Sequence, residues 1–334
     1  MPRTAAVGRL AALAIVVVIH AAGPRAAAQT FREYPIPTSN AVPEAIAAGP
    51  DGAVWFLEKT ANKVGRITTS GVITEYTIPT ANAQPFAGIT TGADGAIWFT
   101  EDEVNKIGRI TTFGTITELT VPTPSSVPYG LSRGPDGNLW FIELTGNKVG
   151  KLTLGGTFTE YPIPTAAAGP VGITLGPDNN LWVTEYEKAK IARVTSSGAF
   201  TEFTLPNPSC GPAQITAGPD GNLWFTEDNG GKIGRMSVSG VLTEFPVTGA
   251  TALRGIAVGA DGNLYFTEPL QSKIGRVTTS GVVTQLATLT PAAFPTFITR
   301  GSDGNLWFGE ASAPPNAISV LDLHVRHRAA RATP

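Results

Sequence analysis

Tryptophan constrains the fold of this chain more than any other residue, because it recurs at one fixed interval. The chain contains six tryptophans and Tyr265 fills the one gap in their series, so that neighbouring members lie 41 to 43 residues apart. The series is Trp55, Trp98, Trp140, Trp182, Trp224, Tyr265 and Trp307. A fixed period of this length indicates a repeat architecture, and seven units of one kind predict a single domain.

Each unit divides into four short strands. In residues 172–206, a first strand ends at an Asp-containing turn, and a second strand carries the tryptophan and ends in Glu. A third strand carries an Arg, and a Gly-containing turn leads to the fourth strand. Prolines then mark the crossing to the next unit. Four antiparallel strands in about 42 residues are the size of one propeller blade. We therefore expect an all-β fold, a seven-bladed β-propeller of four-stranded antiparallel blades.

The two ends of the repeat region predict how the ring closes. The last unit stops after its third strand, near residues 318–321, whereas residues 30–37 before the first unit match a fourth strand. We expect this N-terminal strand to close the last blade. Closure of the ring would remove the exposed sheet edges that favour aggregation.

The segments that flank the repeats differ from them in composition. Residues 1–28 combine basic residues, an apolar run and Ala26-Ala27-Ala28, which is typical of a secretory signal peptide. We expect a propeller over residues 29–321, no membrane span, and a basic, disordered tail over residues 322–334. These segments predict an exported protein, periplasmic or extracellular, and we expect it to be a monomer. The lone Cys210 has no partner for a disulfide, and we assign it no role.

The charge of the repeat region excludes one class of partner. Without the predicted signal peptide and tail, the chain has 18 basic and 25 acidic residues. A nucleic-acid-binding surface needs a basic face. We therefore expect no nucleic-acid partner.

Residues that are the same in every unit are most simply explained by the fold. A Glu ends the second strand of all seven units, and a basic residue follows on the third strand of six. The glutamates are Glu58, Glu101, Glu143, Glu185, Glu227, Glu268 and Glu310. We interpret both series as ladders of structural charges and hydrogen bonds, and the repeated aspartates as turn residues.

Function is expected where the units differ on a surface that a ligand reaches. In propellers this is the opening of the central channel, where the innermost strands of all blades begin. The position that follows the Pro, or its equivalent, before each innermost strand varies between units and holds Glu44, Phe86, Tyr129, Val171, Ala213, Arg254 and Thr296. The next position usually holds a small residue, but in two units it holds Gln214 and Phe297. We predict a ligand-binding pocket formed by Glu44, Phe86, Tyr129, Gln214, Arg254, Thr296 and Phe297. Loop variation without a ligand is the alternative explanation.

The repeat closely resembles that of the virginiamycin B lyase (streptogramin lyase) family over residues 30–321. Residues 214–227, with the sequence QITAGPDGNLWFTE, match the family unit almost completely. The resemblance implies a magnesium-dependent carbon–oxygen lyase that opens the ester of a cyclic depsipeptide by elimination. It also implies histidines at the channel opening in the last two blades, where this chain has Arg254 and Thr296, and a metal-binding carboxylate near Glu310. The only histidines are His20, His324 and His327, in the predicted signal peptide and tail.

Two functional hypotheses remain open. The first is a streptogramin lyase or a related lactone-acting enzyme in which Glu44, Tyr129 and Glu310 surround a divalent cation. The second, which we favour, is an exported propeller that binds a small molecule, peptide, glycan or protein at the channel opening. Arginine stays protonated and threonine is a poor base, so neither can readily remove the proton that an elimination requires.

Overall fold

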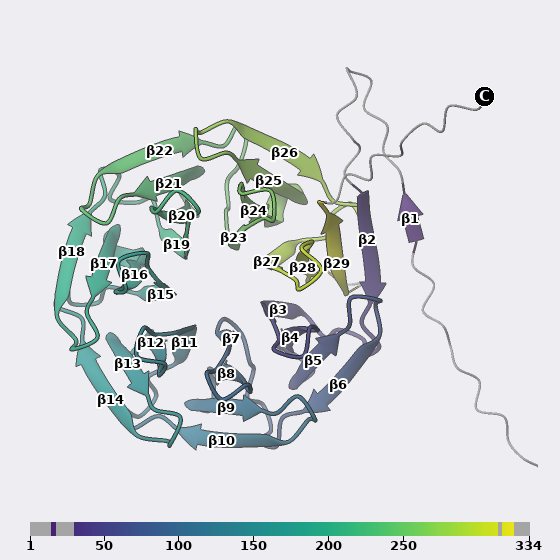
Figure 1. Ribbon diagram of the computed structural model, residues 1–334, viewed down its shortest axis with the longest axis horizontal. Helices are drawn as coiled ribbons and strands as arrows, with labels where there is room; N and C mark the ends of the chain where they lie inside the picture. Colours follow the sequence, from purple (N-terminus) through teal and green to yellow (C-terminus); the bar gives the residue numbers. More distant parts are fainter. Residues whose placement is uncertain (1–14, 18–29, 313–315, 324–334) are drawn as a thin grey trace, which may run out of the picture.

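Seven antiparallel sheets surround a central channel in the computed structural model, which describes residues 15–17, 30–312 and 316–323 (Figure 1). The fold is the expected seven-bladed β-propeller. The helical segments of the described residues are two 3-10 turns, η1 (Tyr186–Lys188) and η2 (Pro269–Gln271). In this part of the chain no helix is long and apolar enough to cross a membrane. The predicted signal peptide, apart from residues 15–17, and the predicted tail from residue 324 onward lie outside the described residues.

Every blade contributes one strand to each of four concentric positions. The innermost strands are β3 (Pro43–Ala48), β7 (Ile89–Thr91), β11 (Pro128–Arg133), β15 (Pro170–Leu175), β19 (Pro212–Ala217), β23 (Ile256–Val258) and β27 (Pro295–Arg300). The second strands are β4 (Val54–Glu58), β8 (Ile97–Glu101), β12 (Leu139–Glu143), β16 (Leu181–Glu185), β20 (Leu223–Glu227), β24 (Leu264–Glu268) and β28 (Leu306–Glu310). The third strands are β5 (Lys63–Ile67), β9 (Lys106–Ile110), β13 (Lys148–Leu152), β17 (Lys190–Val194), β21 (Lys232–Met236), β25 (Lys273–Val277) and β29 (Ala317–Asp322). The outer strands are β6 (Ile73–Thr77), β10 (Ile116–Thr120), β14 (Phe158–Pro162), β18 (Phe200–Thr204), β22 (Leu242–Pro246), β26 (Val283–Ala287) and β2 (Thr30–Pro35). We number the blades 1 to 7 from the one that begins with β3.

The ring closes through the N-terminal strand, as the ends of the repeats predict. In blade 7, β2 pairs antiparallel with β29 from Thr30 opposite Asp322 to Pro35 opposite Ala317. Phe31 and Tyr34 of β2 are buried, and the Tyr34 ring stacks on Trp307 with centroids 6.0 Å apart. A further short strand, β1 (Ile15–Val17), pairs with the free edge of β2, so this sheet has five strands (Figure 1).

The repeated tryptophans are completely buried between blades, and their indole N–H groups explain the repeated aspartates. Trp55, for example, packs with Ile89, Ile97 and Phe99 of blade 2. Its Nε1 donates to Asp51 Oδ1 over 3.1 Å, and Asp51 Oδ2 accepts from Arg66 Nε over 2.6 Å. Tyr265 keeps the pattern, because its hydroxyl lies 2.9 Å from Asp261 Oδ2. A buried donor without an acceptor would be costly, so the aspartate is a hydrogen-bonding residue as well as a turn residue.

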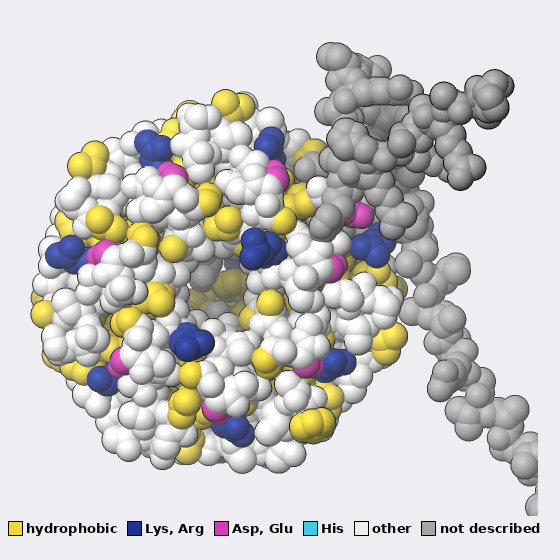
Figure 2. All heavy atoms as spheres, in the orientation of Figure 1, with side chains coloured by type: hydrophobic (Ala, Val, Ile, Leu, Met, Phe, Trp, Pro, Cys, Tyr) yellow, Lys and Arg dark blue, Asp and Glu magenta, His cyan; other side chains and the backbone are white. Residues whose placement is uncertain are grey.

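A second repeated contact joins neighbouring blades near their outer edges. The outer-strand Glu118 of blade 2 accepts from the Thr80 N–H and hydroxyl, on the connection from blade 1, over 3.1 and 2.8 Å. Lys106 lies 3.3 Å from the same carboxylate. Equivalent contacts recur in other blades, and oppositely charged side chains lie next to one another around the face drawn in Figure 2. The outer-strand charges are therefore structural, and so are repeated third-strand basic residues such as Arg66, as their repetition predicted.

Candidate functional site

The innermost strands bring most of the predicted site residues to one opening of the channel. A cavity of about 300 Å³ lies there, and we call it the mouth pocket. Its lining consists of Phe86, Tyr129, Leu144, Gly169, Val171, Tyr186, Glu187, Ala213, Gln214, Asp228, Arg254 and Phe297. Five of the seven predicted site residues are in this set, from blades 2, 3, 5, 6 and 7. Residues about 210 positions apart in the sequence, such as Phe86 and Phe297, therefore share one surface.

Aromatic side chains form one wall of the mouth pocket. The Phe86 ring lies 5.4 Å from the Tyr129 ring and 6.3 Å from the Phe297 ring, with interplanar angles of 56° and 89°. Edge-to-face and tilted arrangements of this kind are favourable for aromatic pairs. The wall is thus a packed, continuous apolar surface of the kind that holds an apolar part of a ligand.

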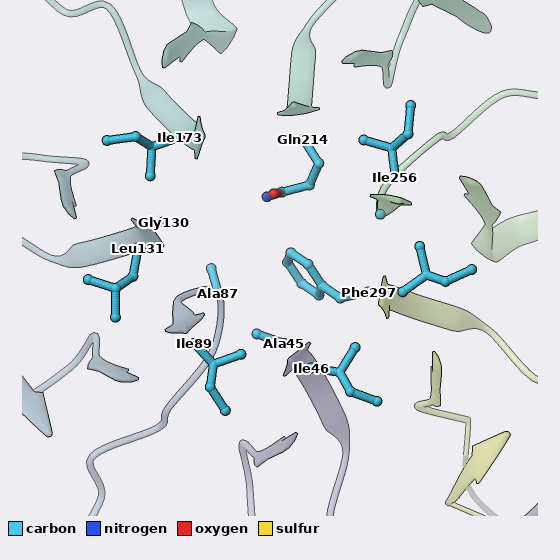
Figure 3. A pocket seen from close by; sticks show the side chains of 12 residues that line it. Ala45, Ile46, Ala87, Ile89, Gly130, Leu131, Ile173, Gln214, Ile256 and Phe297 are labelled. Atoms are coloured by element: carbon cyan, nitrogen blue, oxygen red, sulfur yellow. The ribbon is translucent and has the colours of Figure 1, made fainter. Parts of the chain in front are cut away.

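Gln214 and Phe297 form the floor of the mouth pocket. Both also line a second cavity of about 120 Å³, which lies within the channel and is otherwise lined by small and aliphatic residues. Figure 3 shows the two side chains extending into the channel from their strands β19 and β27. The equivalent positions in the other blades hold only Ala or Gly, so these two residues separate the pocket from the channel interior.

Thr296 does not line either cavity, although it follows Pro295 at the start of β27. It is completely buried, and its hydroxyl donates to the carbonyl oxygen of Pro43 in blade 1 over 3.0 Å. In blades 4 to 6 a second-strand threonine makes the corresponding link, as Thr267 does to the Thr296 carbonyl over 2.6 Å. Blade 7 has Gly309 at that position, and Thr296 supplies the missing hydroxyl. The structure therefore places Thr296 in the contact between blades 7 and 1.

Glu310 is also away from the mouth pocket. It ends β28, opposite Pro295 and Ala317, and only 1% of its surface is exposed. Burial and the nearby Glu33 raise its pKa to about 8. Its surroundings resemble those of the other repeated glutamates, which fits a structural position. Among the described residues, no three Asp, Glu, His or Cys side chains converge as a metal site would require.

Glu44 lies behind the pocket lining and is 5% exposed. Burial raises the pKa of its carboxyl group to about 7, while the charges of Arg254 and Lys59 lower it. Its Oε2 atom has no hydrogen-bond partner among the described residues. A carboxyl group with such a pKa changes its charge near neutral pH.

The family model named Virginiamycin B lyase family matches residues 20–212 and 165–326 of this sequence. The chain belongs to the virginiamycin B lyase family. A solved streptogramin B lyase is 37% identical, with a TM-score of 0.84, over 88% of this chain and 97% of that chain. The virginiamycin B lyase of Staphylococcus aureus, as a selenomethionine protein, is 39% identical with a TM-score of 0.84, over 89% of this chain and 100% of that chain.

A third solved structure is a catalytically inactive variant of the Staphylococcus aureus enzyme, with quinupristin, in which one histidine is replaced by alanine. It is 39% identical, with a TM-score of 0.83, over 89% of this chain and 100% of that chain. The three histidines of the present family member lie outside the described residues. The residues that line its mouth pocket are therefore not histidines.

A second ring of unequal residues at the opening was missed from the sequence. In this virginiamycin B lyase family member, the residue directly after each repeated Glu begins the connection to the third strand. These residues are Lys59, Asp102, Leu144, Tyr186, Asp228, Pro269 and Ala311. Leu144, Tyr186 and Asp228 line the mouth pocket. Six different residue types after seven identical glutamates were the signal that would have predicted this ring.

Tyr186 and Asp228 give the mouth pocket a polar edge on blades 4 and 5. The Tyr186 hydroxyl donates to Asp228 Oδ2 over 3.0 Å and accepts from Asn229 Nδ2 over 3.1 Å. Burial and the Asp228 charge raise the pKa of Tyr186, so the phenol keeps its proton. The pocket thus combines an aromatic wall with fixed donors and acceptors, which can orient a ligand.

Proposed function

We propose that this protein is an exported, monomeric propeller that binds a small molecule, peptide or glycan in the mouth pocket. The observation that carries the proposal is the convergence of unequal side chains from six blades on one cavity of about 300 Å³. Most structural positions in this fold hold the same residue type in every blade, whereas the positions that line the pocket do not. An apolar wall with a few polar anchors is typical of ligand sites.

The residue types favour binding without elimination chemistry. Arg254 and Thr296 occupy the positions where the family resemblance implies histidines, and the structure uses Thr296 as an inter-blade contact. Tyr129 is not a base at neutral pH either, because burial and the Asp102 charge raise the pKa of its hydroxyl. Export is proposed because the composition of residues 1–28 is typical of a secretory signal peptide.

The second candidate function is a carbon–oxygen lyase acting on a cyclic depsipeptide ester. It is favoured by the 37–39% identity to streptogramin B lyase structures over 88–89% of the chain. The described residues do not fit the magnesium ion that this reaction implies by resemblance. Glu310 is enclosed in blade 7, and the described residues bring no two further carboxylate, imidazole or thiolate ligands together with it. We therefore derive no metal-assisted step for this chain.

One experiment separates the two functions. The purified mature chain is titrated with quinupristin by isothermal calorimetry, and parallel samples with magnesium are examined by mass spectrometry for the linear product. We expect the intact mass to persist under all conditions. Product formation that EDTA abolishes would establish the lyase and overturn binding without turnover.

Binding itself is tested with variants of the pocket. Tyr129→Ala and Phe86→Ala should each weaken the binding of a ligand in the mouth pocket by about tenfold or more, because aromatic anchors contribute much of the binding energy in such sites. Phe113→Ala is the control, since Phe113 is 93% exposed and lies in the turn between the third and outer strands of blade 2, outside the pocket lining. Equal affinities for all three variants would refute the pocket as the binding site.

A further inference from the structure

Two basic side chains at the channel opening differ from the basic residues of the blades. Most blade cations are neutralised by a repeated acid, with Lys63 beside Glu75 and Arg66 beside Asp51 as examples. Ten such ion pairs are present in the described part of the chain. Arg254 and Lys59 belong to none of them. Neither charge is therefore needed to balance a repeated carboxylate of the fold.

Aromatic rings hold both of these side chains at the opening. The Arg254 guanidinium lies 5.3 Å from the centroid of the Phe294 ring, in the connection that leads to blade 7. Lys59 Nζ lies 4.3 Å from the centroid of the Phe86 ring, which belongs to the aromatic wall. Arg254 also lines the mouth pocket. A guanidinium presents two parallel N–H donors to a carboxylate or sulfonate, so its geometry suits an anionic group.

Glu44 is the titratable group whose charge competes for Arg254. The groups that face it are Arg254 before β23, Lys59 after β4, Asp102 after β8 and Tyr129 on β11. Burial raises the pKa of Asp102 to about 8, so this neighbour is mostly neutral at pH 7. The Glu44 carboxyl group, with a pKa of about 7, passes from neutral to negative between pH 6 and 8.

The acids of the polar edge belong to other blades. Asp228 and Glu187 line the pocket from blades 5 and 4, whereas the guanidinium of Arg254 extends over Phe294 toward blade 7. Asp228 is also engaged by the Tyr186 hydroxyl. An anionic group on the blade 7 side would therefore meet Arg254, and donor groups of the same ligand would meet Asp228.

Resting on the binding function proposed above, we propose that Arg254 anchors an anionic group of a ligand with an aromatic or apolar body, and that ionisation of Glu44 weakens this anchor. The aromatic wall contacts the apolar body of the ligand, and the guanidinium donates hydrogen bonds to its carboxylate or sulfonate. When Glu44 is protonated, the Arg254 charge is free for the ligand. When Glu44 is ionised, its negative charge compensates Arg254 and repels the anion.

Two fluorescent probes that differ only in an anionic group test this proposal. The first, 8-anilinonaphthalene-1-sulfonate, carries a sulfonate that stays ionised at every pH used. The second, N-phenyl-1-naphthylamine, has the same aromatic skeleton without it. Affinities of the mature protein for both probes are measured from pH 6 to 8. Because the sulfonate does not titrate, any pH dependence specific to the first probe reports on the protein.

We expect the sulfonate probe to bind more tightly at pH 6 than at pH 8, by about fivefold if ligand binding and protonation of Glu44 are coupled by one pKa unit. The affinity of the neutral probe should stay constant. Arg254→Gln should lower the affinity for the sulfonate probe by about tenfold and leave the affinity for the neutral probe unchanged. Arg254→Lys should give an intermediate affinity for the sulfonate probe. Glu44→Gln should abolish the pH dependence. Arg300→Gln, at an exposed arginine that ends β27, is the matched control and should have no effect.

The outcomes that contradict the proposal are separate from those that contradict the binding function. If both probes bind equally well and Arg254→Gln changes neither, the anchor is refuted while the pocket stands. If Glu44→Gln keeps the pH dependence of the sulfonate probe, the assignment of the titrating group is refuted. If neither probe binds, the mouth pocket fails as a binding site and the anchor fails with it.

Discussion

Glu101 allows a sharp test of how the repeated glutamates are held in the fold. It ends β8 and is completely buried, and neither of its carboxylate oxygens has a hydrogen-bond donor among the described residues. Burial first, and then the Glu118 carboxylate of the same blade, raise its pKa to about 8. We therefore expect Glu101 to be protonated in the folded protein at neutral pH. Blade 6 supports this view, because Gln285 replaces the outer-strand Glu there and its Nε2 donates to Glu268 Oε2 over 2.7 Å.

The effect of Glu101 on the free energy of unfolding follows from the linkage between protonation and folding. The folded-state pKa of Glu101, about 8, lies above the ordinary value of 4.5 for a glutamate side chain. The folded state therefore binds more protons than the unfolded chain between these pH values, and stability from this group is lost as pH rises through the window. Each pH unit costs about 1.4 kcal/mol per carboxyl group. From pH 5 to 7, Glu101 should lower the free energy of unfolding by about 3 kcal/mol.

Glu101→Gln removes the titration while keeping the shape of the protonated side chain. Its free energy of unfolding, measured by urea denaturation and tryptophan fluorescence, should fall by about 3 kcal/mol less than that of the wild type between pH 5 and 7. Glu103→Gln is the control, because Glu103 lies on the same blade and is exposed. Parallel pH profiles for the wild type and Glu101→Gln would show that Glu101 is ionised in the fold, and the reasoning would be wrong.

Three further predictions concern the latch, the floor and the turn aspartates. Deletion of residues 30–37 should lower Tm by roughly 10 °C, because β2 buries Phe31 and Tyr34 and pairs with β29; an unchanged Tm by calorimetry would refute the latch. Phe297→Ala should lower the affinity for N-phenyl-1-naphthylamine by about tenfold in fluorescence titrations. An unchanged affinity would show that the floor of the mouth pocket does not contact this probe. Asp136→Ala should destabilise blade 3 by roughly 1–3 kcal/mol in urea, because Trp140 Nε1 loses its acceptor, whereas Asp136→Asn should retain most of the stability.

The fold could be predicted from the sequence because every blade repeats the same physical solution. The tryptophan spacing predicted seven blades, and the N-terminal match to a fourth strand predicted the pairing of β2 with β29, both of which the structure shows. The replacement of Trp by Tyr265 was also informative, since a phenol hydroxyl reaches Asp261 where the indole N–H would. The repeat period did not reveal that the turn aspartate also accepts a hydrogen bond from the tryptophan indole four residues later. A turn residue and a hydrogen-bond acceptor at the same position give the same repeated Asp in the sequence.

The site was predictable only in part, because position along a strand does not determine the direction of a side chain. Phe86, Tyr129, Gln214, Arg254 and Phe297 line the mouth pocket, as a ring of residues at strand starts suggested. Glu44 occupies the equivalent position and yet is buried behind the lining. The residues after the repeated glutamates reach the same opening from the neighbouring connections, and comparison of innermost strands alone could not include them.

Thr296 shows how one substitution in a repeat can move a residue from the site into the fold. Its position alone groups it with Arg254 and Tyr129, which line the pocket. The difference arises on the neighbouring strand, where Gly309 lacks the hydroxyl that Thr184, Thr226 and Thr267 direct to the next blade. Thr296 donates to Pro43 instead, and blades 7 and 1 remain linked. A residue that differs between repeats therefore indicates a ligand site only when no partner position has changed with it.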